Sequence, residues 1–137
     1  MKQTTCIFHS VLVAAGLFGS AAIADEKMNT AQISALITGN TLYVDMPAGA
    51  PGAPVGGTAP IFFESDGSAS ALLPAGLKLF GAWRLEDGSY CVDWDNGPKN
   101  SCTQIVRGAV GFIVTDASRD EPRGVITRIA TGNAENL

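Results

Sequence analysis

Two cysteines are the residues of this chain whose type and spacing could most directly do chemistry. Cys91 and Cys102 lie in the C-terminal half, whereas the third cysteine, Cys6, lies in an N-terminal segment that we expect to be removed. Two cysteines in an exported chain most simply form a disulfide, and closing so short a loop contributes on the order of 2 to 3 kcal/mol. A redox or metal pair is the weaker alternative, because the spacing is not Cys-x-x-Cys and no third ligand type clusters nearby. We therefore predict a Cys91–Cys102 disulfide.

The single histidine, His9, lies in the same N-terminal segment, so the chain beyond it has no imidazole. Triads of the Ser/His/Asp or Cys/His type need such a base. Zinc sites of the usual kind need histidines or free thiolates. The sequence therefore predicts no enzyme of these types, no metal site and no cofactor.

Four acidic residues lie close together along the chain at Glu86, Asp87, Asp93 and Asp95. Glycoside hydrolysis uses two carboxyl groups that face each other across a cleft, and Glu86 and Asp93 are the residues we would assign to that role. The alternative is that acids gather here because Asp and Asn favour the geometry of turns. We favour the turn interpretation and predict no catalytic residues.

The same segment contains fragments of a calcium-binding loop, at Asp93, Asp95, Asn96 and Gly97. Hard cations such as Ca²⁺ bind clustered oxygen ligands. The fifth position of this loop is neither Asp nor Asn, and the twelfth is not Glu. The sequence therefore does not predict a calcium site.

Asp87-Gly88 is the clearest hairpin signal, because this pair accepts the positive φ values of a type I′ turn. It joins an expected strand over residues 83–86 to one over 89–94, and alternation along both strands creates two faces. One face consists of Trp83, Leu85, Tyr90, Val92 and Trp94, and the other of Arg84, Glu86, Cys91 and Asp93. We expect the aromatic face to be core. Its aromatic residues Trp83, Tyr90 and Trp94 are also our candidate contacts to a ligand or partner, although inward-facing tryptophans are more often core.

A second turn is predicted at Asn96-Gly97. Pairing about its centre places Cys91 directly opposite Cys102, which supports a cross-strand disulfide. Pro98 cannot donate a backbone hydrogen bond, so the turn could be looser than two residues.

The remaining chain reads as one short helix followed by short strands. Residues 25–29 are polar and expected to be unstructured, Thr30 is the expected N-cap of a helix over 31–37, and Gly39 is placed to end it. Further strands are expected at 41–45, 61–63, 69–73, 103–107, 110–115 and 125–129, with a turn at Asp66-Gly67. We predict a mainly β fold: a small antiparallel β-barrel or curved sheet of about seven or eight strands with one short N-terminal helix.

Two segments are expected to be loops. Residues 46–60 are dominated by Pro, Gly and Ala and cannot pack a core, and residues 116–124 are rich in charge. The proline-rich segment is either a mobile lid or partner-binding loop, or a tolerated insertion between two strands, and we favour the insertion.

The first 24 residues have the pattern of a secretory signal peptide. Lys2 is followed by an apolar run from Ile7 to Gly19 and by a small-residue Ala-x-Ala cleavage site ending at Ala24. The run is shorter than the roughly 20 residues that a membrane span needs. The alternative is an N-terminal core helix, which fits the abrupt change to acidic residues less well. We therefore predict cleavage after Ala24 and a single soluble periplasmic domain over residues 25–137, without a membrane anchor.

The charge of the chain bears on its partners. Nine Lys and Arg stand against 13 Asp and Glu, for a formal net charge of −4. No basic run could follow a phosphate backbone, so nucleic acid is not an expected partner. We expect either a small ligand or an envelope protein.

Short motifs in residues 30–107 are similar to those of a known family. They are the helix end Gly39-Asn40-Thr41, the Phe62-Phe63 strand with Asp66-Gly67, Gly81-x-Trp83 leading to Asp87-Gly88, and Tyr90-Cys91. In these motifs the chain resembles the small exported Gram-negative family catalogued as domain of unknown function 995. The resemblance implies a periplasmic location and a β-rich, barrel-like domain, and it implies no activity and no catalytic residues. The insertion at 46–60 departs from the shorter connection expected of that family.

Three functions are consistent with these observations. The first is a non-enzymatic periplasmic binding module for a small apolar or saccharide ligand or for an envelope protein. The second is an inhibitor of an exported hydrolase, such as a lysozyme or protease, with residues 46–60 and 116–124 as its contact loops. The third is a carboxylate-dependent glycan hydrolase using Asp93 and Glu86. An open barrel mouth lined by aromatic residues would favour a ligand, whereas a filled interior would favour a protein partner.

Overall fold

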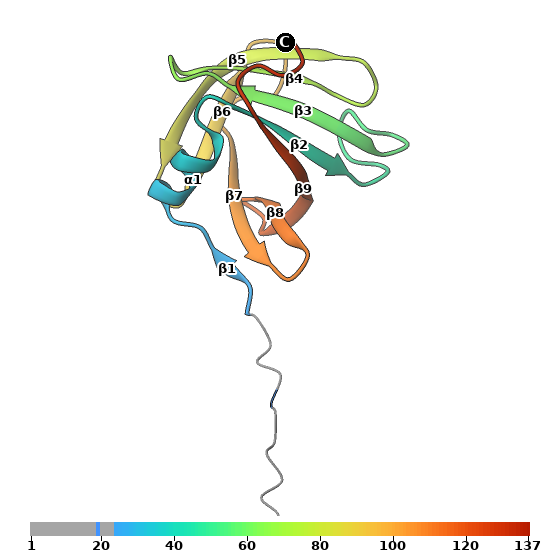
Figure 1. Cartoon of the computed structure of the whole chain (residues 1–137). Coiled ribbons are helices and arrows are strands. Elements are labelled where there is room, and N and C mark those ends of the chain that lie inside the picture. The colour runs from blue at the N-terminus through green and yellow to red at the C-terminus, as the bar shows by residue number, and fades with distance from the viewer. Residues whose placement is uncertain (1–18, 20–23) are drawn as a thin grey trace, which may run out of the picture.

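The computed structural model describes Gly19 and residues 24–137 (Figure 1). Apart from Gly19 and Ala24, the expected signal peptide, including Cys6 and His9, lies outside the described residues, so its cleavage stays a prediction. The elements follow one another as β1 (Glu26–Lys27), α1 (Thr30–Ile37), β2 (Asn40–Met46), β3 (Gly57–Phe63), β4 (Ser68–Leu72), β5 (Lys78–Glu86), β6 (Ser89–Trp94), β7 (Ser101–Gly108), β8 (Gly111–Asp116) and β9 (Glu121–Thr131). None of the described helices has the length and apolar character that a membrane span requires.

Strands β2 to β9 form a closed antiparallel barrel. Neighbours along the chain pair with one another, and β9 also pairs with β2, which closes the ring. The predicted fold class, a mainly β barrel of seven or eight strands with a short N-terminal helix, is confirmed: eight strands form the barrel and β1 is an additional strand.

The predicted hairpin of β5 and β6 is confirmed in its register. Leu85 pairs with Tyr90 and Cys91 with Arg84 across a turn in which Gly88 has a φ of 71°, a value that glycine adopts without strain. On the predicted core face, Tyr90, Val92 and Trp94 are buried, and Trp83 and Leu85 are half-buried against the core.

The predicted disulfide is also present. Cys91 lies directly opposite Cys102 in the pairing of β6 with β7, and their sulfurs are bonded. The connection between these strands spans residues 95–100, so it is looser than the two-residue turn at Asn96-Gly97. The register about that turn is nevertheless the predicted one.

Helix α1 closes one end of the barrel. Its inward-facing Ile33 and Ile37 are completely buried, and the helix contacts β2, β5 and β6 (Figure 1). The predicted N-cap was wrong by one residue. Asn29 caps the helix instead, in a reciprocal capping box with Gln32. The side-chain oxygen of Asn29 accepts from the Gln32 amide at 2.9 Å. The Thr30 hydroxyl instead ties the helix to the β5–β6 turn by accepting from the Gly88 amide at 2.9 Å.

The prediction that residues 25–29 are unstructured was wrong. Glu26 and Lys27 form β1, which pairs with the C-terminal part of β7 where β6 no longer covers its edge. Met28 continues this attachment: its amide donates to the Ile105 carbonyl at 2.8 Å and its side chain is 5% exposed. Unpaired backbone groups along β7 are thereby satisfied, which is the physical reason for order in so polar a segment.

Four connections lie at the end of the barrel opposite α1, over residues 47–56, 73–77, 95–100 and 117–120. Both expected loops are shorter than predicted. The loop at 46–60 is reduced because Met46 pairs with Gly57 in the β2–β3 hairpin. The prediction of an exposed loop over residues 116–124 was wrong for most of that length, since Asp116 is buried at the end of β8 and residues from Glu121 onward belong to β9.

Candidate functional site

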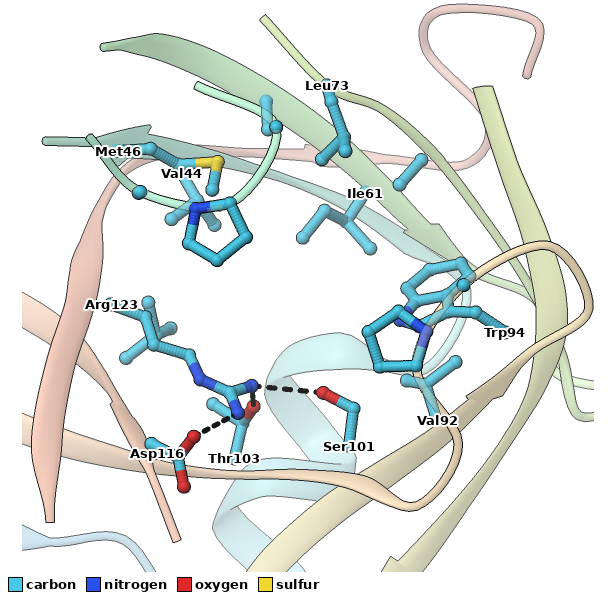
Figure 2. Close-up of a pocket in the computed structure, with 18 of the residues that line it drawn as sticks. Val44, Met46, Ile61, Leu73, Val92, Trp94, Ser101, Thr103, Asp116 and Arg123 are labelled. Atoms are coloured by element: carbon cyan, nitrogen blue, oxygen red, sulfur yellow. Dashed lines mark hydrogen bonds and ion pairs between the residues drawn. The ribbon is translucent and has the colours of Figure 1, made fainter. Parts of the chain in front are cut away.

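The end of the barrel opposite α1 opens into a cavity of about 860 Å³ (Figure 2). This volume lies within the range of small-molecule sites, roughly 300 to 1,000 Å³. Residues from the strands and from all four connections at this end line it. The barrel therefore has a closed end and an open mouth.

One side of the cavity is an apolar wall, which we define as Val44, Met46, Ile61 and Leu73. These residues come from β2, from β3 and from the connection that follows β4 (Figure 2). They face inward because alternate residues of a strand point to the same side of the sheet. Such a wall can bind the hydrocarbon part of a ligand.

The opposite side is a polar cluster of Arg123, Asp116, Ser101 and Thr103. The Arg123 guanidinium donates from Nη1 to the Ser101 hydroxyl at 3.1 Å and to the Thr103 hydroxyl at 3.0 Å, and from Nη2 to the Asp116 carboxylate (Figure 2). The Arg123 side chain is 36% exposed, whereas that of Asp116 is 12% exposed. The arginine is thus fixed by β7 and β8 and remains accessible.

A β-bulge aims Arg123 into the barrel. Val114 pairs with Gly124 and Thr115 with Pro122, so Arg123 is the extra residue of β9 between two pairs. A bulge re-aims the side chain it carries, and it also accommodates a proline within a strand. The local backbone therefore explains why an arginine projects into the interior.

Asp116 is held in its ionised form. Its Oδ1 accepts from the Ser118 hydroxyl at 2.6 Å, the Ser118 amide at 2.8 Å and the Arg119 amide at 3.2 Å. The hydrogen bonds from Ser118, followed by the one from Arg123, hold the pKa of Asp116 well below its usual range. The carboxylate thus positions the arginine and stays charged.

Two of the three predicted contact residues line this cavity. Tyr90 and Trp94 are among its lining residues, and burial raises the pKa of the Tyr90 phenol despite opposing contributions from Thr103 and Arg123. Trp83 is not among those residues: its Nε1 donates to the Glu64 carbonyl at 2.8 Å, and its ring packs edge-on against Phe63. Trp83 therefore stabilises the barrel wall near α1.

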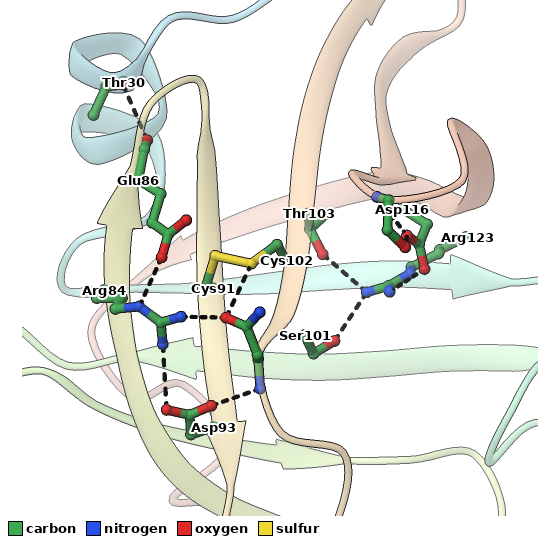
Figure 3. The surroundings of a disulfide bond; sticks show 12 residues. Thr30, Arg84, Glu86, Cys91, Asp93, Ser101, Cys102, Thr103, Asp116 and Arg123 are labelled. Atoms are coloured by element: carbon green, nitrogen blue, oxygen red, sulfur yellow. Dashed lines mark hydrogen bonds and ion pairs between the residues drawn. A yellow bond between two sulfur atoms is a disulfide. The ribbon is translucent and has the colours of Figure 1, made fainter.

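The acids considered for glycan hydrolysis lie elsewhere, on the outer face of β5 and β6 (Figure 3). Arg84 pairs with both of them, at 3.0 Å from its Nε to Glu86 Oε1 and at 3.2 Å from its Nη1 to Asp93 Oδ2. Asp93 also accepts from the Asn100 amide at 2.6 Å, which fixes the 95–100 connection. Asp87 and Asp95 are exposed residues of turns. These acids stabilise local structure on the outside of the barrel.

A possible set of metal ligands occurs beside the disulfide. The ligand atoms of Glu86, Cys91 and Cys102 lie within 4.8 Å of one another. Both sulfurs are bonded to each other, so neither is a thiolate that could bind a metal ion. This group therefore does not form a metal site while the disulfide is intact.

Sequence reasoning missed the polar cluster. Asp116 and Arg123 were assigned to an exposed loop, because the segment between them is charged and contains a proline. The Asp-x-Ser spacing at residues 116–118 does predict a turn, since the side chain of Asp can accept from the backbone two residues later. Nothing in the sequence shows that this turn borders a cavity.

The fold and the site together define a class of protein: a small antiparallel β-barrel that a helix closes at one end and that opens at the other into a cavity with an arginine inside. Comparison of the chain with protein-family models, with curated proteins and with solved structures found no match. The resemblance to domain of unknown function 995 stays a prediction.

Proposed function

We propose that this chain is a non-enzymatic binding module that holds a small, mainly apolar ligand inside its barrel, and that it works in the periplasm after export. The cavity is the observation that carries this proposal. It combines an apolar wall with a few converging polar groups, which is the usual composition of small-molecule sites. The Cys91–Cys102 disulfide supports export, since such bonds persist in oxidising compartments.

The chemistry of the cavity favours binding over catalysis. A general acid or base works best with a pKa near the working pH. The pKa of Asp116 is shifted in the opposite direction, and its hydrogen bonds already engage both of its oxygens. The acids proposed for glycan hydrolysis, Glu86 and Asp93, are both paired with Arg84 outside the cavity.

The binding of N-phenyl-1-naphthylamine, an uncharged fluorescent probe of apolar sites, tests the proposal. We expect saturable binding of one probe per chain, with enhanced fluorescence. Ile61→Trp should weaken this binding at least tenfold, because Ile61 belongs to the apolar wall and a larger side chain fills the cavity. The matched control is Ala82→Trp, which adds a tryptophan at an exposed position of β5.

Two results would contradict the proposal. One is wild-type protein that shows no saturable probe binding. The other is equal loss of binding in Ile61→Trp and Ala82→Trp, which would place the probe on the surface. Circular dichroism of both variants establishes that each is folded.

A further inference from the structure

The Arg123 guanidinium has hydrogen-bonding capacity that the protein itself does not use. A guanidinium offers five N–H donors. Three of them donate to Ser101, Thr103 and Asp116, so two donors, on Nε and Nη2, have no partner among the described residues. No buried side-chain nitrogen or oxygen of the described residues lacks a partner, so the unpartnered Nε is accessible rather than sealed, in keeping with an Arg123 side chain that is 36% exposed.

The charge of the residues that line the cavity also favours an anionic group on the ligand. Its lining includes three cationic residues, Lys99, Arg119 and Arg123, against two anionic residues, Asp116 and Glu121. The chain as a whole is acidic, with a formal net charge of −4. The residues that line the cavity thus have a formal charge of +1, in contrast to the acidic chain as a whole.

Asp116 accepts hydrogen bonds from other donors besides Arg123. One of its oxygens accepts from the Ser118 amide, the Ser118 hydroxyl and the Arg119 amide, and only the other faces Arg123. The Arg123–Asp116 pair is formally neutral, so a second anion would be held by the N–H donors of the guanidinium that the protein leaves free. A carboxylate on the ligand is the natural partner for its two remaining donors.

The arrangement of the two sides then defines the shape of the ligand. The polar cluster faces the apolar wall of Val44, Met46, Ile61 and Leu73 across the cavity (Figure 2). We infer that the ligand is a single-chain amphiphile whose acidic head group binds Arg123 and whose hydrocarbon tail lies against the apolar wall. This inference rests on the proposed function and names its ligand class.

Competition against N-phenyl-1-naphthylamine with three probes of equal chain length tests this inference. They are decanoate, 1-decanol and decyltrimethylammonium, and decyl sulfate is added to separate carboxylates from other acids. Hydrogen bonds to charged groups are worth about 1.5 to 3 kcal/mol, so we expect decanoate to bind about tenfold or more tightly than 1-decanol. The cation should bind most weakly. If decyl sulfate binds at least as tightly as decanoate, this would contradict a carboxylate as the head group of the ligand.

Variants of Arg123 test whether this residue causes the preference for decanoate over 1-decanol. In Arg123→Met the ratio of decanoate to 1-decanol affinity should fall to about one, and Arg123→Lys should keep part of it because the charge remains. Arg84→Met is the matched control, since Arg84 is also paired with carboxylates but lies outside the barrel, and it should keep the wild-type ratio. If Arg123→Met does not fold, the double variant Asp116→Asn with Arg123→Met removes both charges and answers the same question.

The outcomes separate this inference from the proposed function. Absence of probe binding by the wild-type protein overturns both. Normal probe binding with equal affinity for decanoate and 1-decanol, or with the cation preferred, overturns only the acidic ligand. An unchanged ratio of decanoate to 1-decanol affinity in a folded Arg123→Met variant shows that another residue binds the head group, and it overturns the role of Arg123.

Discussion

The two ends of the barrel differ in how their inward-facing side chains are used. At the end covered by α1, the fully buried Ile33 and Ile37 of the helix belong to the same cluster as Leu42, Phe63 and Ile105 of the strands. Toward the mouth, residues of this cluster such as Val44 and Trp94 also border the cavity. The same strands supply both environments, so the strand pattern does not decide between them.

Side-chain size and the helix explain the difference. Along β3 the inward-facing side chains increase in volume, from Ala59 near the mouth through Ile61 to Phe63 near α1. Ala59 occupies less of the interior than Ile61 or Phe63, whereas α1 fills the opposite end with isoleucines. The proposed binding cavity therefore lies at the end that the helix does not fill.

The largest expected effect compares one residue type at the two ends. Ile37→Ala should lower the free energy of unfolding by about 2 to 5 kcal/mol, because it leaves a void in a closed core. Ile61→Ala should cost less than half as much, since it only enlarges an existing cavity. Urea denaturation of both variants measures the difference. Equal losses would show that the mouth is packed as tightly as the core.

The next effect tests the disulfide that fastens the mouth connection 95–100. Replacing both Cys91 and Cys102 by alanine should lower the free energy of unfolding by about 2 to 3 kcal/mol, because the bond restricts a short loop of the unfolded chain. Reduction of the wild-type protein with dithiothreitol, followed by the same urea titration, is the matched measurement. A loss of less than 0.5 kcal/mol in both experiments, on the order of a surface substitution, would contradict the prediction.

A smaller effect is expected at the cap of the helix. Asn29→Ala should lower the free energy of unfolding by about 1 kcal/mol, because the Gln32 amide loses its acceptor. Asn29→Asp keeps an acceptor at this position and should stay close to wild type. Thermal unfolding of the three proteins provides the comparison, and a stable Asn29→Ala variant would mean that α1 is held by packing alone.

A final effect concerns two turns that share the pattern Asp-x-Ser, one at each end. In Asp66-x-Ser68 and Asp116-x-Ser118 the aspartate accepts from the serine amide at 2.8 Å and from its hydroxyl at 2.6 Å. Hydrogen bonds from these serines lower the pKa of both carboxyls, and Asp116 is also paired with Arg123. A lowered folded-state pKa stabilises the fold above the unfolded pKa, near 4, and that stabilisation is lost as the pH falls below it.

Substitution separates the two turns in this pH range. The wild-type protein should lose free energy of unfolding as the pH falls from about 4 to 2. Asp116→Asn should reduce this loss more than Asp66→Asn does, because only Asp116 is buried and paired with an arginine. Urea midpoints measured across this range provide the test. A stronger effect at the exposed Asp66 would show that the ion pair with Arg123 adds nothing to folding.

The sequence predicts the parts of this fold that depend on local geometry. The hairpin register follows from Asp87-Gly88, and the same reasoning about Asn96-Gly97 places Cys91 opposite Cys102. These predictions succeed because a short turn fixes the pairing of the residues beside it. Tyr90 and Trp94 were likewise identified correctly as inward-facing.

The parts that depend on distant pairing could not be predicted. The two residues of β1 are ordered by an open edge of β7, which no local pattern of residues 25–29 reveals. Arg123 enters the cavity because of a bulge against β8, and a bulge shifts the alternation on which inward and outward assignments depend. Asn29 and Thr30 are both good N-caps, so composition alone does not distinguish them.

The closing strand has a consequence for how the chain reaches this structure. Asn40, near the start of the barrel, pairs with Thr131, a few residues from the C-terminus. A folding chain therefore exposes the unpaired edges of β2 and β8 until β9 has paired with both, and such edges invite pairing with other chains. Contacts so far apart in sequence also slow folding. A copy of this chain without a paired β9 is consequently prone to aggregate, and a truncation that removes β9 makes that hazard permanent.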